Sequence, residues 1–295
     1  MLVASKTVAA RYRAEIKNEI RLLDTQLKVV GLLTGDYGPS HTYAEYTRNA
    51  CEELGISYEL RHVPRLEMEQ AIFDVNNDPT IHGVMVYYPI FANEQDRFLK
   101  DLVDYRKDIE GLNVHWIAKL YQNERTIDGS REAGKAVVPC TSLAILKILE
   151  ANGAYGSSGV NPAAGKTVTI FNRSEVVGRP LAVMMSNDGA RVHSFDENGP
   201  LLYVDGKPQE SDISRGDALG ESDLVITGVP AKGFDKVRYE ELMPHAVCLN
   251  FATIKNFTAE AEENAALFIP RVGPVTVAMC MRNTLRLYHS YHRRG

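Results

Sequence analysis

The stretch FNRSEVVGRP, residues 171–180, holds residue types that suit a phosphate-bearing ligand. It follows the β-branched run TVTI and precedes an apolar helical pattern, which is where a dinucleotide-binding turn lies. Asn172 stands where such a turn has its first glycine, and Gly178 is the glycine that the segment retains. An ordinary turn between a strand and a helix explains the same pattern, so the motif by itself leaves both interpretations open.

An acidic residue ends the next expected strand, ARVHSFD. Asp196 follows the turn at about the spacing at which an acid binds the adenine ribose hydroxyls of NAD. The alternatives for Asp196 are a helix cap and a solvated carboxylate. Neither alternative predicts the whole order of strand, turn, helix, strand and acid, so a dinucleotide site is the favoured interpretation.

The elements around these residues alternate between strand and helix patterns, which indicates βαβ units with parallel strands. KVVGLLTG, ISYELRHV and IHGVMVYYP are the strands expected in the first half, and the first helix is expected over about 5–27. The Gly/Ser/Pro/Ala-rich stretch 153–165 is the predicted linker. Beyond it five strands are expected, with a long polar excursion over about 197–221 and a last helix over about 275–292.

This pattern predicts two α/β lobes, of which the second is a Rossmann-like, doubly wound parallel sheet, with the ligand in the cleft between them. The expected domains are residues 1–152, completed by the C-terminal helix 275–295, and residues 153–274. The first is the expected catalytic domain and the second the expected dinucleotide-binding domain.

Composition excludes several classes of protein. The net charge of −5 over 295 residues argues against a nucleic-acid surface. A secretory signal and an apolar run long enough to span a membrane are both absent from the sequence, so a cytoplasmic protein is expected. Four scattered cysteines indicate reduced thiols rather than disulfides or a zinc site. His289 and His292 lie in a basic tail that is expected to be solvated, so no metal site is predicted.

Several segments together resemble the methylenetetrahydrofolate dehydrogenase/cyclohydrolase family: GKTVTIFNRSEVVGRPLA, KDIEGLN, PCTSLAILKIL and VGPVTVAMCMRNTLR, with HTYAEYTRNACEELGI and HGVMVYYPI. The resemblance covers essentially the whole chain and is closest to the monofunctional, NAD-dependent branch. It implies a homodimer that oxidises 5,10-methylenetetrahydrofolate to the 5,10-methenyl form with NAD. The family's turn is Gly-Arg-Ser-x-x-Val-Gly-x-Pro, so Arg173 and Ser174 are expected to reach the cofactor phosphates.

Departures from the family pattern bear on the second reaction, hydrolysis of the methenyl product. Bifunctional members have Tyr-x-x-x-Lys on the helix that starts near Ser40, and here the two positions are Tyr43 and Thr47. Tyr87 replaces a glutamine, and Glu110 stands where most members have aspartate. A threonine cannot move the hydrolytic proton as a lysine can. The resemblance therefore implies a dehydrogenase with little or no cyclohydrolase activity, in which Tyr43 stacks on the p-aminobenzoyl ring and Glu110 holds the pterin.

The candidate site residues fall into three groups. The catalytic candidates are Tyr43, Thr47 and Cys140, the last without a covalent role. The substrate-binding candidates are Tyr43, Tyr87, Pro89, Glu110, Gly273 and Pro274. The cofactor-binding candidates are Arg173, Ser174, Gly178, Asp196, Thr227, Gly228, Val229, Asn250, Phe251 and Ala252, of which the last six end successive strands.

Two other functions stay open at this point. One is a bifunctional or NADP-dependent member of the same family. The other is a catalytically silent folate- or nucleotide-binding protein, which the changed residues at Thr47 and Tyr87 would permit.

Overall fold

The computed structural model describes residues 4–35, 38–130, 134–156, 159 and 161–293. The chain divides into two compact units, one made of residues 1–8 and 141–275 and the other of residues 9–140 and 276–295. Part of the predicted linker 153–165, namely residues 157, 158 and 160, lies outside the described residues. Within the described ranges, none of the helices has the length and apolar character needed to cross a membrane.

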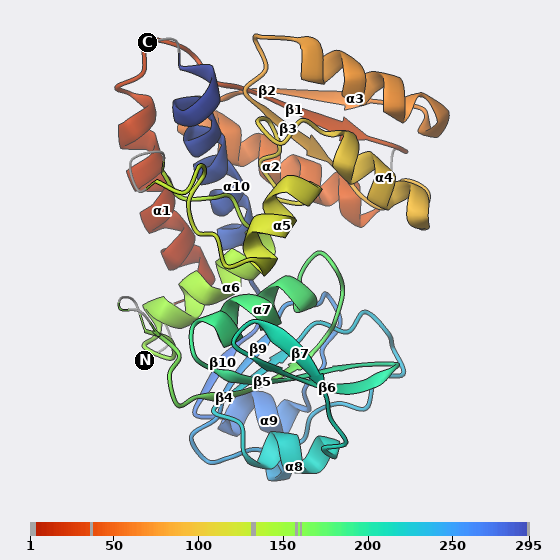
Figure 1. Cartoon of the computed structure of the whole chain (residues 1–295), viewed down its shortest axis with the longest axis vertical. Coiled ribbons are helices and arrows are strands. Elements are labelled where there is room, and N and C mark those ends of the chain that lie inside the picture. The colour runs from red at the N-terminus through yellow and green to blue at the C-terminus, as the bar shows by residue number, and fades with distance from the viewer. Residues whose placement is uncertain (1–3, 36–37, 131–133, 157–158, 160, 294–295) are drawn as a thin grey trace. The chain divides into compact units, whose positions relative to one another are not determined.

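The unit of residues 9–140 and 276–295 is built on a three-stranded parallel sheet in the order β2-β1-β3 (Figure 1). Its strands are β1 (Lys28–Leu33), β2 (Ser57–His62) and β3 (Gly83–Val86), which confirms the three strands expected in this half. Its helices are α1 (Ser5–Ile20), α2 (Pro39–Leu54), α3 (Met68–Asn77), α4 (Glu94–Leu102), α5 (Val114–Tyr121) and α10 (Gly273–Leu287), with a short 3-10 turn η1 (Arg65–Glu67) before α3. Helix α1 ends earlier than predicted, and its first residues count with the other unit.

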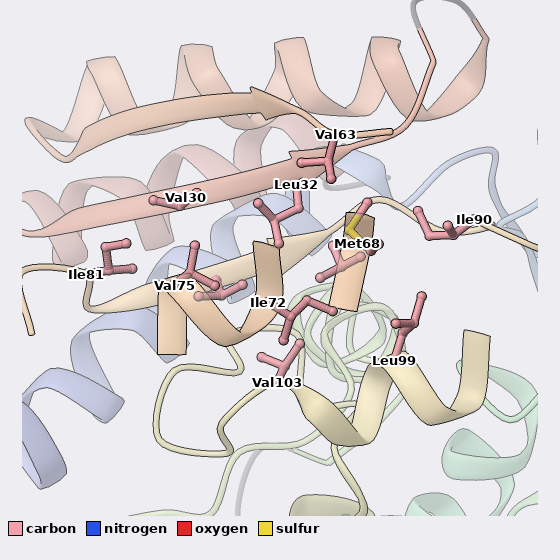
Figure 2. Packing of buried hydrophobic residues seen from close by; sticks show 12 residues of the cluster. Val30, Leu32, Val63, Met68, Ile72, Val75, Ile81, Ile90, Leu99 and Val103 are labelled. Carbon is pink, nitrogen blue, oxygen red and sulfur yellow. The ribbon is translucent and has the colours of Figure 1, made fainter. Parts of the chain in front are cut away.

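One face of this sheet packs on α3 and α4. The buried cluster joins Val30 and Leu32 of β1 to Ile72 of α3 and Leu99 of α4 (Figure 2). Strand residues alternate between the two faces, so β3 presents Val84 and Val86 to this cluster. The neighbouring positions Met85 and Tyr87 therefore face α2, where they meet Thr47 and Tyr43.

The other unit contains a seven-stranded sheet in the order β10-β9-β8-β4-β5-β6-β7. Its five parallel strands are β4 (Thr167–Phe171), β5 (Arg191–Asp196), β8 (Leu224–Thr227), β9 (Val247–Asn250) and β10 (Leu267–Ile269). Its helices are α6 (Cys140–Ala151), which starts one residue before this unit, α7 (Gly178–Asn187), α8 (Arg215–Gly220) and α9 (Ala259–Asn264), with the 3-10 turn η2 (Tyr239–Glu241). The predicted two-lobed α/β class, with a Rossmann-like second lobe, is confirmed.

The polar excursion expected over about 197–221 is in fact ordered structure. Strands β6 (Gly199–Val204) and β7 (Lys207–Glu210) form a hairpin that extends the sheet in antiparallel sense beside β5. Asp205 and Gly206 make its two-residue turn with φ angles of 49° and 75°, which matches the Asp-Gly preference of such turns.

The expectation of a solvated C-terminal tail is wrong in part. Residues Tyr288–His292 form a π-helical turn, η3, and His292 donates from Nε2 to the carbonyl of Arg106 at 2.9 Å. The His292 ring also packs edge-on against His82, with ring centroids 5.6 Å apart. His289 is exposed as expected.

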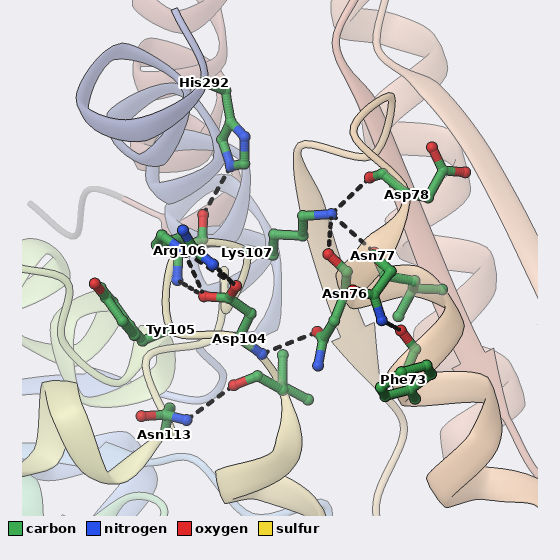
Figure 3. Close-up of polar contacts among 12 residues, drawn as sticks. Phe73, Asn76, Asn77, Asp78, Asp104, Tyr105, Arg106, Lys107, Asn113 and His292 are labelled. Atoms are coloured by element: carbon green, nitrogen blue, oxygen red, sulfur yellow. Dashed lines mark hydrogen bonds and ion pairs between the residues drawn. The ribbon is translucent and has the colours of Figure 1, made fainter.

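Lys107 ties the end of α3 to the chain that leads to the candidate substrate residues (Figure 3). Its ammonium group donates to the carbonyls of Val75, Asn76 and Asp78 at 2.9, 2.8 and 2.6 Å, and the residue is 4% exposed. The last carbonyls of a helix lack partners within the helix, so this buried cation satisfies groups that would otherwise be orphaned.

Lys107→Met should lower the free energy of unfolding of this unit by about 2–4 kcal/mol, because three carbonyls lose a charged donor in a buried place. Trp116 is the single tryptophan of the chain and is fully buried in the same unit, so its fluorescence in a urea titration reports on this unit. Arg97→Met, at an exposed ion pair with Glu94, is the control and should cost less than about 1 kcal/mol. An equal loss in both variants would contradict the prediction.

Candidate functional site

The turn after β4 is organised by the side chain of Asn172. Its Oδ1 accepts hydrogen bonds from the backbone N–H of Ser174 at 3.0 Å, from the Ser174 hydroxyl at 2.8 Å and from the N–H of Gly178 at 3.1 Å. Its Nδ2 donates to the carbonyl of Gly228, at the end of β8, at 2.8 Å. The residue that replaces the family's first glycine therefore closes the turn and ties two strand ends together.

Gly178 begins α7 under tight steric constraint. A Cβ at this position would lie 1.9 Å from the carbonyl oxygen of Asn172. Such a distance is impossible without moving the backbone, so only glycine fits the turn. Gly178 is buried and serves the turn's shape rather than a direct contact surface.

A pocket of about 630 Å³ opens beside this turn. This volume is within the usual range for cofactor sites. Of the predicted cofactor residues, the pocket is lined by Asn172's neighbours Arg173 and Ser174 and by Asp196 and Val229. The other lining residues, which the sequence did not single out, are Phe171, Phe195, Glu197, Pro230, Ala231, Gly233 and Phe234.

Arg173 is held against β5 and β6 in this structure. Its guanidinium pairs with Asp196 Oδ1 at 2.8 Å and also donates to the carbonyls of Ser194 and Gly199. Its side chain is only 7% exposed. Most of its donors are therefore occupied, whereas the phosphate contact expected from the resemblance stays a prediction.

Asp196 ends β5 and presents one free acceptor to the pocket. Its Oδ1 takes Arg173 and the N–H of Asn198, both at 2.8 Å. Its Oδ2 has no hydrogen bond within the described residues, although the carboxylate lines the pocket. An unpaired carboxylate oxygen at a strand end is suited to accept hydroxyl donors from a ribose.

The remaining strand-end candidates hold the loops together and do not line the pocket. Thr227 is fully buried, and its hydroxyl donates to Asn250 Oδ1 at 3.1 Å. Asn250 Nδ2 donates to the carbonyls of Ile254 and, more weakly, Ala252. Gly228 makes room for Phe251, since a Cβ there would lie 1.8 Å from the phenyl ring.

In the other unit, Tyr43 and Thr47 lie on one face of α2, as their spacing predicts. The Tyr43 ring meets the Tyr87 ring edge-on at 5.9 Å, and its hydroxyl lies 3.9 Å from Cys280 Sγ. Thr47 is fully buried, and its hydroxyl donates to the carbonyl of Tyr43 at 3.0 Å. The threonine hydroxyl is therefore used inside the helix and offers no proton-transfer group.

Tyr87 is buried, and its hydroxyl lies 2.8 Å from the hydroxyl of Tyr58 on β2. Gly31 on β1 provides the space, because a Cβ there would lie 2.4 Å from the Tyr58 hydroxyl and 2.9 Å from the Tyr87 ring. The sequence had not pointed to Tyr58. Pro89, two residues after Tyr87, is exposed and follows a cis peptide bond.

Glu110 lies on the loop that follows Lys107. Burial, followed by the neighbouring Asp108 carboxylate, raises the pKa of Glu110 to about 8, although the Val86 N–H and Lys100 act in the opposite direction. A carboxyl group with this pKa carries a proton at neutral pH in the free protein and loses it readily when donors approach. Perturbed carboxyl groups of this kind gather at functional sites.

Cys140 lies directly behind Glu110, since its N–H donates to the carbonyl of Glu110 at 3.1 Å. Its thiol donates to the carbonyl of Ile109 at 3.2 Å and accepts from Asn283 Nδ2 at 3.2 Å. Burial raises the pKa of the Cys140 thiol well above its ordinary value, so it stays protonated and is no nucleophile. All four cysteines are free thiols in buried places.

The structure brings Tyr43, Thr47, Tyr87, Glu110 and Cys140 together in one unit. Gly273 and Pro274 belong to the other unit, at the start of α10, where Gly273 is exposed. Three residues beside Glu110 and Tyr87 had escaped the sequence reasoning: Asp108, Lys100 and Tyr88. The described residues contain no cluster of His, Cys, Asp and Glu that could hold a metal ion.

Comparisons with known proteins match two stretches of the chain to two domains of one family. Residues 3–110 match the catalytic domain of tetrahydrofolate dehydrogenase/cyclohydrolase, and residues 139–230 match its NAD(P)-binding domain. The chain belongs to the tetrahydrofolate dehydrogenase/cyclohydrolase family.

Within the family the chain is similar to several NAD-dependent enzymes. It is 40% identical over 291 residues to methylenetetrahydrofolate dehydrogenase [NAD(+)] of Dictyostelium discoideum, covering 96% of this chain and 92% of that protein. It is 38% identical over 306 residues to the enzyme of the same name from Saccharomyces cerevisiae, covering 97% and 95%.

Solved structures place the fold in the same family. The NAD-dependent 5,10-methylenetetrahydrofolate dehydrogenase from Saccharomyces cerevisiae superposes with a TM-score of 0.89 at 36% identity, over 98% of this chain and 97% of that one. The bifunctional enzyme of Campylobacter jejuni has a TM-score of 0.79 at 21% identity, over 98% of both chains, and so shares the fold.

Asn172→Gly restores the family's glycine but removes the oxygen that gathers the turn. We expect it to weaken NAD binding by about tenfold, because three accepted hydrogen bonds and one donated bond disappear together. Isothermal titration calorimetry measures this change. Asn264→Gly makes the same exchange at an exposed helix end and should leave the affinity unaltered. Equal or tighter binding by Asn172→Gly would show that the asparagine does not organise the site.

Proposed function

We infer that this protein is an NAD-dependent methylenetetrahydrofolate dehydrogenase. It oxidises 5,10-methylenetetrahydrofolate to 5,10-methenyltetrahydrofolate by hydride transfer, as part of one-carbon metabolism. The relatives that match nearly the whole chain at 38–40% identity carry this activity in their names. We further propose that the protein has little or no cyclohydrolase activity.

The observation that carries the second part is the state of Thr47. Thr47 occupies the position of the family's lysine and is fully buried. Its hydroxyl donates a hydrogen bond to the carbonyl of Tyr43. Hydrolysis of the methenyl product requires an activated water and a group that moves its protons. Neither Thr47 nor the paired hydroxyls of Tyr58 and Tyr87 supply such a group.

Hydride transfer makes smaller demands on the protein. NAD, when bound, supplies the acceptor for the hydride. The lone pairs of the folate nitrogens assist the departure of the hydride from the methylene carbon, so the protein has only to orient the substrate and exclude water. Glu110 would accept the two donors on the pterin edge, and Tyr43 would pack against the p-aminobenzoyl ring. Asp196 would accept the adenine ribose hydroxyls.

The test is an assay of the purified protein with methylenetetrahydrofolate and NAD. Growth of the NADH absorbance band is the expected result, and its absence would favour a silent binding protein. The same sample is then followed for decay of methenyltetrahydrofolate in a buffer in which spontaneous hydrolysis is slow. Decay no faster than without protein is expected, whereas robust catalysed decay would point to a bifunctional enzyme.

Cofactor choice is expected to depend on Asp196. Its charge repels the 2′-phosphate of NADP, and its unpaired Oδ2 accepts a ribose hydroxyl. Asp196→Ser should therefore raise the KM for NAD by about tenfold and bring the efficiencies with NAD and NADP closer together. Glu197→Ser, which removes a charge from the next position of the pocket lining, is the matched control and should preserve the preference. A wild-type protein that used both cofactors equally would refute the assignment.

Folate binding is expected to depend on pH through Glu110. The pterin edge presents two donors, so it binds the ionised carboxylate, whereas the free protein holds a proton on a group with a pKa of about 8. Affinity for 5-formyltetrahydrofolate should therefore rise with pH up to about 8 and then level off, losing about tenfold per unit below it. Glu110→Gln should bind more weakly at high pH and lose this dependence, while NAD affinity holds. Calorimetry over the pH range measures the affinities for the folate and for NAD. A wild-type folate affinity independent of pH would contradict the role of Glu110 in binding the pterin.

We also propose the finer assignments. Residues 1–152 with 275–295 are proposed to bind folate and residues 153–274 to bind NAD, with Gly273 and Pro274 on the folate side. A homodimer is proposed from the family resemblance, and light scattering on the purified protein tests it. A cytoplasmic location is proposed because four free cysteines suit a reducing compartment.

A further inference from the structure

The loop that carries Glu110 is wound around one buried carboxylate. Asp108 Oδ1 accepts from the N–H groups of Glu110 and Gly111, both at 3.0 Å. Its Oδ2 accepts from the N–H groups of Leu112 and Asn113, both at 2.7 Å. Four consecutive backbone donors thus converge on a side chain that is 4% exposed. An amide side chain has only one acceptor atom and could not satisfy them all.

Other contacts lock the same loop from outside. Gly111 has a φ of 74°, and a Cβ there would lie 2.6 Å from the carbonyl carbon of Val138. Asn113 Nδ2 donates to the carbonyl of Val103 at 2.8 Å and to that of Asp101 at 3.1 Å. The backbone position of Glu110 is therefore fixed by its neighbours before any substrate arrives.

A cation lies near the Glu110 carboxyl group. Lys100 of α4 lines a small cavity together with Asp108, Glu110 and Tyr88. The cavity, of about 10 Å³, has room for at most about one water molecule. The Lys100 ammonium lies 5.3 Å from the centre of the Tyr88 ring, and within the described residues it has no ion pair or hydrogen bond. The carboxylates that favour its charged form are Asp96 first, then Glu110 and Asp101.

We propose that Asp108 and Lys100 are the positioning residues of Glu110. Asp108 fixes the backbone that carries the carboxyl group and places a like charge beside it, and Lys100 places an opposite charge near it. This assignment deepens the proposed function, because it rests on Glu110 as the anchor of the pterin ring. Neither residue touches the substrate in this assignment, and both act through Glu110.

The electrostatic effect of each neighbour on Glu110 can be measured on its own, because few of the groups around Glu110 are ionised. The titratable groups that face it are Asp108 on its own loop, Lys100 on α4, Tyr43 on α2, Tyr87 and Tyr88 after β3, and Cys140 at α6. Burial raises the pKa of the phenols and the thiol, so these stay neutral. Burial raises the pKa of Asp108 to about 6, so above that pH Asp108 and Lys100 remain as the charged neighbours, with opposite effects on Glu110.

The experiment measures the affinity for 5-formyltetrahydrofolate by calorimetry between about pH 6 and pH 10. Asp108→Asn removes the like charge, so the pH at which affinity levels off should fall, and the plateau should weaken by about tenfold as the loop loosens. Lys100→Met keeps the apolar stem but removes the opposite charge, so the same pH should rise while the plateau changes by less than about threefold. The matched control is Asp104→Asn. The wild-type Asp104 carboxylate pairs with Arg106, so this variant should change neither the pH at which affinity levels off nor the plateau affinity. The proposal would be overturned if the pH at which affinity levels off moved in the same direction in Asp108→Asn and Lys100→Met. It would also be overturned if that pH moved in neither variant.

Hydrogen exchange on the wild-type protein tests the loop without any variant. The amides of residues 110–113 should exchange at least about a hundredfold more slowly than those of an open loop, because a buried carboxylate holds each one. Exchange as fast as in the exposed loop of residues 231–233 would refute the positioning role of Asp108 even if the variant failed to fold.

The failure of this proposal is distinguishable from failure of the proposed function. If Glu110→Gln retains the folate affinity of the wild type at every pH, the anchor itself is wrong. If Glu110→Gln abolishes the pH dependence but Asp108→Asn and Lys100→Met leave it in place, Glu110 is the anchor and the positioning proposal falls alone.

Discussion

Loops that follow parallel strands carry backbone N–H groups that no ladder or helix satisfies, and buried groups of this kind require acceptors. In this protein buried or half-buried side-chain oxygens supply them. Asp108 gathers four consecutive N–H groups, and Asp96 gathers three on the loop after the cis peptide bond at Pro89. In the dinucleotide unit, the side-chain oxygens of Asn172 and Asn256 accept hydrogen bonds from loop N–H groups in the same way. The candidate binding residues Glu110, Ser174 and Val229 stand on loops held in this way, so their placement is settled before a ligand binds.

The replacements that separate this chain from bifunctional relatives form one packed arrangement. The Thr47 hydroxyl donates to a carbonyl of its own helix, and the Tyr87 hydroxyl is hydrogen-bonded to the Tyr58 hydroxyl. The two phenols fit because Gly31 has no side chain. A lysine introduced at 47 would enter a fully buried place, which is costly for a charged group. The packing around Thr47 therefore involves several residues of the core of the unit.

Much of the fold could be predicted because it follows from local patterns. Apolar runs of strand length marked the parallel strands, and Gly153 ends α6 where expected, with a φ of 71°. The hairpin of β6 and β7 was missed although Asp205 and Gly206 carried its signal, because the polar strand β7 shows no apolar alternation. The docking of His292 depends on the carbonyl of Arg106, which is remote in sequence, and no local pattern reveals such a partner.

The candidate site was predictable to a similar extent. Asp196 follows from the order of elements, and it does line the pocket beside the turn. Its pairing with Arg173 could not be foreseen, since it depends on how an arginine folds back across two strands. Tyr58 reaches Tyr87 from another strand, and the sequence offers no signal for that contact. Asp108 could have been found, because an aspartate shortly before a glycine often caps its own loop through backbone N–H groups.

The reaction itself gives a reason for a carboxyl group that is easily ionised. Loss of hydride converts a neutral one-carbon bridge into a cationic methenyl group, so negative charge near the folate favours the transition state over the substrate. In the free protein burial and Asp108 keep Glu110 protonated near neutral pH, which avoids an uncompensated buried anion. If Glu110 holds the pterin as we propose, the donors of the pterin edge would favour its ionised form and binding would draw the proton away. The resulting negative charge would favour the cationic product of hydride loss and so add to the orientation of the substrate.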